Sequence, residues 1–218
     1  AVRRGEWPDQ LARFLALLGY SVPVFWLGLM GLLVFYARLD LVGGPGRQSI
    51  AFQDFVPGVT GMILVDCLIA GDGAAFLDAL RHIVLPASVL GYFSLAYVCR
   101  MTRSLMLDQL SQEYVTAARL KGVPERQVIW RHAFRNVAVP LVTVVALSYG
   151  HLLEGSVLTE TVFAWPGLGN YLTDSLLRSD MNGVLGATIV VGAVFVSLNL
   201  LSDVLYRALD PRARQAAP

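Results

Sequence analysis

The chain of 218 residues is 56% hydrophobic and 15% charged, and its mean hydropathy is +0.59. Soluble domains average about 45–50% apolar and about 25% charged residues, so this composition excludes an ordinary soluble domain and favours a polytopic membrane protein. The formal net charge of +1 says little about partners, and no nucleic-acid partner is predicted. The distribution of charge between the two sides of the membrane is more informative.

The first predicted transmembrane helix covers about residues 15–39 and follows an arginine-bearing segment. Its section 19–36 has no charged residue and approaches the length of roughly 20 residues that a bilayer span requires. Pro23 lies inside this section. We expect it to bend the helix, because proline removes a backbone hydrogen bond.

Residues 40–79 are predicted to lie outside the membrane, between the first and second spans. Their apolar run at residues 58–70 is too short to cross a bilayer, so a re-entrant or interfacial helix is expected there. Asp66, Asp72 and Asp78 give the segment an acidic balance. Two interpretations stay open: these are solvated loop charges, or they attract a cationic substrate.

A charged loop of about residues 108–135 follows the second predicted span, residues 80–107. The pattern predicts a short helix that ends at Gly122, then a second helix that begins after Pro124 and continues into the next span. One face of the short helix holds four residues: Tyr114, Ala117, Ala118 and Lys121. The two alanines are expected to form a small, flat, exposed surface that another backbone can approach closely.

Lysine and arginine are distributed unequally between the two sides of the predicted spans. With the third and fourth spans at about residues 136–158 and 184–206, one side holds 13 of these residues. The other side holds 4: Arg38, Arg47, Arg81 and Arg178. The positive-inside rule therefore places the charged loop and both visible termini in the cytoplasm, and the segments 40–79 and 159–183 outside.

Two ionisable residues, His151 and Glu154, lie three residues apart in the outer half of the third span, with Glu160 near its end. Ionisable groups inside a membrane are costly and are functional candidates by default. Either His151 and Glu154 line a polar conduit or gate, or they pair with each other or with a neighbouring helix. Their number and spacing predict no metal site, and the separated Cys67 and Cys99 predict neither a disulfide nor a zinc site.

Several segments carry a resemblance to a known family. A-A-R-L-K-G, from Ala117, and R-H-A-F-R-N-V-A-V-P, from Arg131, resemble the cytoplasmic coupling loop, or EAA loop, of ABC importer permeases. Two further segments are similar to the B-type permease of the dipeptide, oligopeptide and nickel subfamily: E-T-V-F-A-W-P-G-L-G at 160–169 and N-L-L-S-D-V-L-Y-R-A-L-D-P-R at 199–212. The similarity covers about residues 19–214, although Thr116 stands where the loop's name-giving glutamate is expected.

The resemblance implies an all-α bundle of the type I ABC importer permease kind, forming a single domain over residues 1–218 in the bacterial inner membrane. Six transmembrane helices are expected, so two N-terminal helices would lie outside the given sequence. The implied role is a channel subunit for short peptides. The implied partners are a homologous C-type permease subunit, two ATPase subunits that bind ATP and Mg²⁺, an extracytoplasmic solute-binding protein and membrane lipid. No cofactor is expected on this chain.

The resemblance also implies which residues act. Coupling to the ATPase is assigned to seven residues: Glu113, Tyr114, Ala117, Ala118, Arg119, Lys121 and Gly122. The segment with Glu160 and Trp165 is implied to form part of an outer gate that faces the solute-binding protein.

Other substrates and classes remain as alternatives. Nickel chelates and haem are carried by similar permeases. A polytopic membrane enzyme that uses His151 and Glu154 is another possibility, but the sequence has no G-x-S-x-G or H-E-x-x-H motif. A secondary transporter is a third, but no internal inverted repeat is visible. The absence of a G-x-x-x-x-G-K-[ST] phosphate loop places ATP hydrolysis on separate chains.

Overall fold

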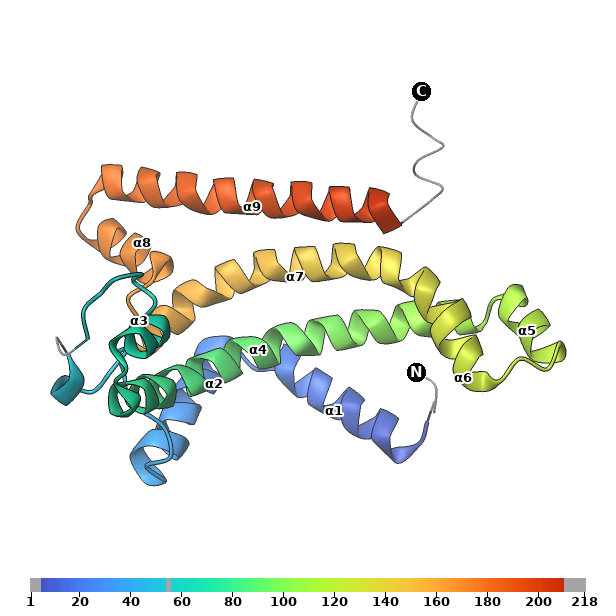
Figure 1. Cartoon of the computed structure of the whole chain (residues 1–218), viewed down its shortest axis with the longest axis horizontal. Helices are drawn as coiled ribbons and strands as arrows, with labels where there is room; N and C mark the ends of the chain where they lie inside the picture. Colours follow the sequence, from blue (N-terminus) through green and yellow to red (C-terminus); the bar gives the residue numbers. More distant parts are fainter. Residues whose placement is uncertain (1–4, 54–55, 210–218) are drawn as a thin grey trace. The chain divides into compact units, whose positions relative to one another are not determined.

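The computed structural model describes residues 5–53 and 56–209, except for the side chains of Tyr20, His151, Glu154 and residues 206–209. Within this part of the chain, all regular structure is helical (Figure 1), which confirms the all-α prediction. The helices are, in order, α1 (Trp7–Ser21), α2 (Val24–Gly31), η1 (Leu32–Arg38), η2 (Ile50–Phe52), α3 (Ile63–Ala70), α4 (Gly73–Leu110), α5 (Glu113–Leu120), α6 (Glu125–Gln127), η3 (Val128–Ala133), α7 (Phe134–Val162), α8 (Leu168–Leu177) and α9 (Met181–Leu209). Two of these are π-helices, η1 and η3, and η2 is a 3₁₀ turn.

The chain forms two compact units. Unit 1 comprises residues 1–21, 94–151 and 191–218, and unit 2 comprises residues 22–93 and 152–190. The long helices α4, α7 and α9 each contribute one part to each unit. The charged loop therefore belongs to unit 1, whereas both predicted outer segments belong to unit 2.

Within residues 5–53 and 56–209, three helical segments are long and apolar enough to cross a membrane: Gly73–Leu110, Glu125–Gly150 and Met181–Leu205. The segments Trp7–Gly19 and Val24–Arg38 make a fourth if together they form one broken span. The predicted span 15–39 is not a continuous helix, because it is interrupted at Val22 and Pro23. Pro23, in an extended conformation with ψ 134°, is the N-cap of α2, so it ends one helix and starts another.

Unit 2 places two small cores around the outer segments. Cys67, Ala75 and Ala79 form one core where α3 packs on α4. Leu85, Val89 and Phe163 form the other, and Gly28 packs against Phe163 with little space between them. The apolar run at residues 58–70 thus includes a helix of 8 residues, α3, packed on the start of α4.

The three acidic residues of the first outer segment all make hydrogen bonds. The Asp66 carboxylate is 2% exposed and accepts hydrogen bonds from Thr60 and Gly61. These bonds, led by that from the Thr60 hydroxyl, lower the pKa of Asp66. Asp72 accepts from the amides of Ala74 and Ala75 at the start of α4, and Asp78 accepts from Ser49. The interpretation as solvated loop charges is therefore wrong for Asp66, which is buried.

In unit 1, α4 packs against η3 and the start of α7 around Met106, Ala133 and Val137. Helix α1 is joined to α4 by an ion pair in which Arg103 Nε and Nη2 lie 2.8 Å and 3.0 Å from the two Asp9 carboxylate oxygens. This two-pronged geometry is the strong form of an arginine–carboxylate contact. It fixes α1 on α4 despite the many exposed apolar side chains of α1.

Candidate functional site

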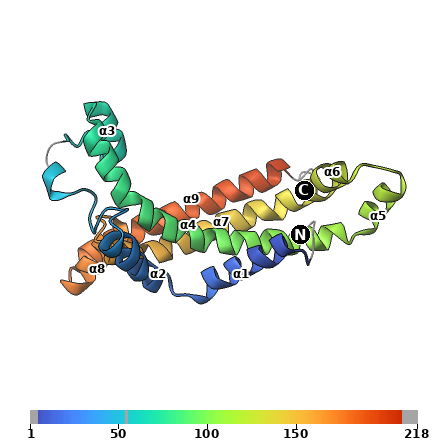
Figure 2. The same cartoon turned by 90° about the horizontal axis from the view of Figure 1, so that it is seen from below.

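The charged loop of unit 1 connects α4 to α7 and contains α5, α6 and η3 (Figure 2). Helix α5 ends at Leu120, and Gly122, two residues later, is left-handed with φ +77°. The Gly122 amide donates to the Arg119 carbonyl at 2.9 Å and the Val123 amide to the Ala118 carbonyl at 3.2 Å, which is the Schellman arrangement that closes a helix end. The chain then restarts after Pro124 as α6, η3 and α7. The predicted helix, break and second helix are thus confirmed.

The loop has its own apolar core. Val115 and Val128 are fully buried and Ala118 is 9% exposed, and these three pack together with Leu110 and Val123. The prediction that Ala118 lies on the exposed surface is therefore wrong. The face of α5 that carries Val115 and Ala118 packs against η3, because contact between the Val115 and Val128 side chains removes both of them from water.

Polar contacts add to the connection between α5 and the helix that continues into α7. The Tyr114 hydroxyl donates to Gln109 Oε1 at 2.8 Å and accepts from Asn136 Nδ2 at 3.0 Å. Arg119 and Glu125 form a two-pronged ion pair across the break at 2.7 Å and 3.1 Å. The hydrogen bonds to Glu125 raise the pKa of Arg119, but an exposed pair of this kind contributes little to stability.

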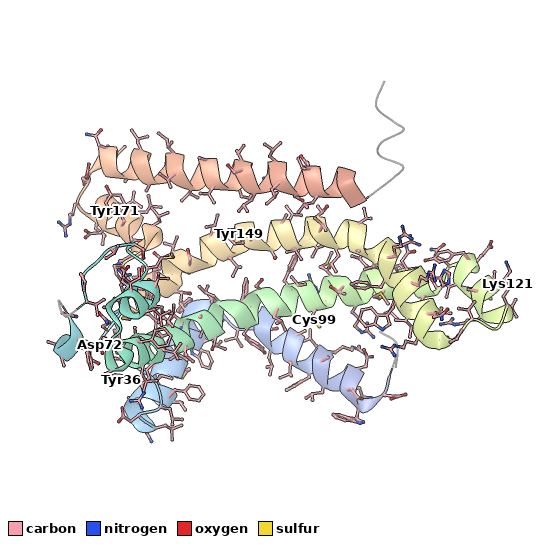
Figure 3. The ribbon with its side chains drawn as sticks, in the orientation of Figure 1. Tyr36, Asp72, Cys99, Lys121, Tyr149 and Tyr171 are labelled. Carbon is pink, nitrogen blue, oxygen red and sulfur yellow. The ribbon has the colours of Figure 1, made fainter. Side chains whose placement is uncertain are left out.

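The outer surface of α5 presents small, apolar and charged side chains to the surroundings. The exposed predicted coupling residues are Glu113, Tyr114, Ala117, Arg119, Lys121 and Gly122. Leu120, which the sequence interpretation did not single out, is 85% exposed, and Lys121 lies at the tip of the loop (Figure 3). A leucine this exposed beside an exposed alanine suits contact with another protein surface.

The predicted gate residue Glu160 is part of a tight connection in unit 2 between the end of α7 and the start of α8. The Asn170 amide donates to Glu160 Oε2 at 2.9 Å. The carboxylate thus accepts from an amide in the first turn of α8, where amides have no partner within the helix. Glu160 also packs against Gly167, where any side chain would collide with its carboxylate. At Gly169, an added Cβ would lie 2.5 Å from Val157 Cα.

Gly169 is therefore required by close packing against the backbone of α7, whereas at Gly167 the Glu160 side chain would have to move to admit a larger residue. The sequence interpretation missed the packing role of Gly167 and Gly169, although their positions within a dense motif were a signal. The Trp165 amide donates to the Glu160 carbonyl at 2.8 Å and the Trp165 side chain is half-buried. The side chains of His151 and Glu154 lie outside the described residues, so their assignment to a conduit stays a prediction.

No cluster of three or more potential metal ligands occurs in the described part of the chain. The loop around α5 has one exposed face, and its other face is joined by packing and hydrogen bonds to the helix that continues into α7.

The chain is similar in sequence to permease proteins of peptide transport systems. The dipeptide transport system permease protein DppB of Escherichia coli strain K12 is 45% identical over 98% of this chain and 63% of its own length. The probable D,D-dipeptide transport system permease protein DdpB of the same strain is 43% identical over 97% of this chain and 62% of its own length. The di/tripeptide transport system permease protein DppB of Pseudomonas aeruginosa strain UCBPP-PA14 is 41% identical over 98% and 63%, respectively.

The chain therefore spans slightly less than two thirds of the length of these relatives. Residues 1–215 match the family described as binding-protein-dependent transport system inner membrane component. The match covers almost the whole chain. On this basis, the chain belongs to the family of inner membrane components of binding-protein-dependent transport systems.

Proposed function

We propose that this chain is the channel-forming part of one permease subunit in an ATP-driven importer of short peptides. The relatives named above are permeases of dipeptide or di/tripeptide systems, which supports the substrate class. The observation that carries the proposal is the loop around α5, whose exposed face is separate from the face that joins it to η3.

In this proposal, the exposed face of α5 binds a groove on an ATPase subunit, which holds ATP and Mg²⁺ on a separate chain. Ala117 is small and exposed, so it lets the groove come close to the helix backbone, while Leu120 supplies apolar area. The buried Val115, Ala118 and Val128 make α5 and η3 one packed piece. A displacement of α5 by the ATPase is therefore transmitted to α7, which is continuous with η3.

The remaining partners follow from the same assignment. A homologous permease subunit completes the channel, and an extracytoplasmic solute-binding protein delivers the peptide to the outer side, where α8 and Trp165 lie. Most large apolar side chains of α9 are exposed in the chain alone. In a membrane, such a helix is covered by lipid or by another subunit.

The orientation is testable by labelling. The excess of arginine and lysine places Lys121 and Arg126 in the cytoplasm and Arg47 and Arg178 outside. We expect an impermeant maleimide applied to whole cells to label cysteine at positions 47 and 178 but not at 121 and 126. Cys99 is exposed, so the full-length protein would carry Cys99→Ser in this assay. Labelling at position 121 from outside would contradict the proposed topology.

The transport function is tested by uptake into vesicles. We expect full-length permease, reconstituted with its second permease subunit, ATPase subunits and binding protein, to accumulate labelled alanyl-alanine only when ATP is present. Vesicles loaded with a non-hydrolysable ATP analogue are the control. Uptake that needs no ATP, or that depends on a proton gradient alone, would refute the proposal and favour a secondary transporter.

A further inference from the structure

A preformed cavity of about 380 Å³ lies in unit 2 between the loop after η1 and the first turns of α4. Its polar lining residues include Tyr36, Asp40, Gln48, Asp78, Arg81 and His82, and Tyr36 is seen on η1 in Figure 3. Small-molecule sites usually have volumes of about 300–1,000 Å³. This cavity is at the lower end of that range, so it suits a small ligand.

The loop that forms one wall is held in place by the backbone. The Gly43 amide donates to the Arg81 carbonyl at 2.8 Å, and the Gly46 amide donates to the Phe163 carbonyl at 2.8 Å. Gly43 lies against the His82 ring, and Gly44 lies against the Tyr36 ring, so that neither position has room for a side chain. The cavity is therefore shaped before any ligand arrives, which reduces the entropy cost of binding.

His82 is 6% exposed and supplies a hydrogen-bond acceptor to this cavity. Its Nδ1 lies 2.8 Å from the Asp78 backbone carbonyl. Because a carbonyl only accepts, Nδ1 is the donor, and Nε2 of the neutral ring is left with a lone pair. No partner for Nε2 occurs among the described residues. His82 Nε2 is not among the buried unpaired side-chain atoms of the described residues, so solvent reaches it and it can accept a hydrogen bond from a donor-bearing ligand in the cavity.

Other side chains that line the cavity can also accept hydrogen bonds, although Tyr36, Ser49 and Gln53 carry donors as well. Gln48 directs its Nε2 toward Cys67 Sγ at 3.8 Å, so its carbonyl oxygen remains available. Asp78 accepts two hydrogen bonds from Ser49, and a carboxylate can accept more than two. Asp40 is exposed at the rim, where Arg81 is also exposed. The lining thus carries two carboxylates, those of Asp40 and Asp78, against one guanidinium, that of Arg81.

We propose that this cavity binds a primary ammonium group, and specifically the free N-terminus of a short peptide. The ammonium group has three donors and one positive charge, which matches His82 Nε2, the Gln48 carbonyl and the carboxylates of Asp40 and Asp78. Arg81 at the rim is placed to receive the peptide carboxylate. The identity of the ligand as a peptide rests on the proposed function, whereas its ammonium chemistry follows from the lining residues.

Equilibrium dialysis of radiolabelled alanyl-alanine against the detergent-purified full-length permease, without the binding protein, tests this site. We expect saturable binding that N-acetyl-alanyl-alanine, which lacks the ammonium group, does not compete away. Asp40→Asn, which keeps the side-chain shape, and His82→Phe, which keeps a ring against Gly43, are each expected to weaken binding roughly tenfold to a hundredfold.

Asp174→Asn is the matched control, because Asp174 is an exposed carboxylate of unit 2 that pairs with Arg178 and does not line the cavity. We expect it to bind the dipeptide as the parent protein does. The proposal is overturned if the acetylated dipeptide competes equally, if Asp174→Asn weakens binding as much as Asp40→Asn, or if the parent protein binds no dipeptide. Import of alanyl-alanine by vesicles whose permease shows no such binding would reject the site but leave the proposed function intact. Binding without ATP-driven import would support the site but reject the proposed function.

Discussion

Replacing Gly169 with alanine is expected to displace α8 from the end of α7 and to abolish most peptide uptake. The new Cβ would lie 2.5 Å from Val157 Cα and 2.9 Å from Val157 Cγ2. The first of these atoms is backbone, so no rotamer change relieves the clash. Overpacking of this kind costs about 1–3 kcal/mol, and more where the backbone must move. Thermal unfolding of the purified full-length protein, together with vesicle uptake, measures the two effects.

Gly186→Ala is the matched control for this substitution. Gly186 lies in α9, and no atom lies within 4 Å of the position that its Cβ would take. Alanine there is expected to leave uptake unchanged and to stabilise the helix slightly, since alanine has a higher helix propensity than glycine. Equal thermal stability of the two variants would contradict the packing described at the junction of Val157, Glu160 and Gly169.

The second large effect is expected from Ala118→Glu in the loop of unit 1. Ala118 packs against Val115 and Val128, and a glutamate there would put an unpaired carboxylate into an apolar core. Burial of an uncompensated charge costs several kcal/mol, which exceeds what a core of three small side chains supplies. We expect the loop to unfold locally while the membrane helices stay folded. Limited proteolysis with trypsin, which cleaves after Arg119 and Lys121, would show faster cutting in this variant.

Ala117→Glu is the control for local unfolding, because it adds the same side chain to the neighbouring residue. Ala117 is exposed, so the glutamate stays in water and the change in folding free energy is expected to be about 0.5 kcal/mol or less. Its trypsin sensitivity should match that of the parent protein. If Ala118→Glu resists trypsin equally well, the buried position of Ala118 described above is wrong.

The course of the backbone in the loop could be predicted because its signals are local. Gly122 provides the left-handed end of α5, and Pro124 starts the next helix, so both ends are specified by single residues. At the start of α5, Gln112 occupies the N-cap without a side-chain bond, and the hydroxyl of the preceding Ser111, a residue type common at N-caps, donates to the Asp108 carbonyl instead. Two sites so near in sequence are hard to distinguish without the packing of α5.

The exposed face of α5 could not be predicted from helical spacing alone. Ala117 and Ala118 are adjacent, so a helical wheel allows either to face outward, and the decision depends on Val128, which arrives from η3 beyond the break. The role of Glu160 was missed for a similar reason. Its partner amide, Asn170, follows a turn whose path depends on the close contact at Gly169.

The membrane helices were predictable because length and composition determine them, but their local deviations were not. The predicted first span is broken at Val22 and Pro23, and η1 and η3 are π-helices. A π-turn is a local rearrangement of the hydrogen-bond register, and the apolar pattern of the sequence contains no separate sign of it.

Binding of the ATPase subunits to the Ala117→Glu permease tests the central claim most directly. The full-length variant, purified in detergent, would be compared with the parent protein for retention of the ATPase subunits and for ATP hydrolysis stimulated by peptide-loaded binding protein. We expect a folded, trypsin-resistant loop in a permease that loses both retention and stimulation, because an added charge on the exposed face blocks close approach of the groove. Retention and stimulation equal to those of the parent protein would contradict the assignment of α5 as the coupling helix.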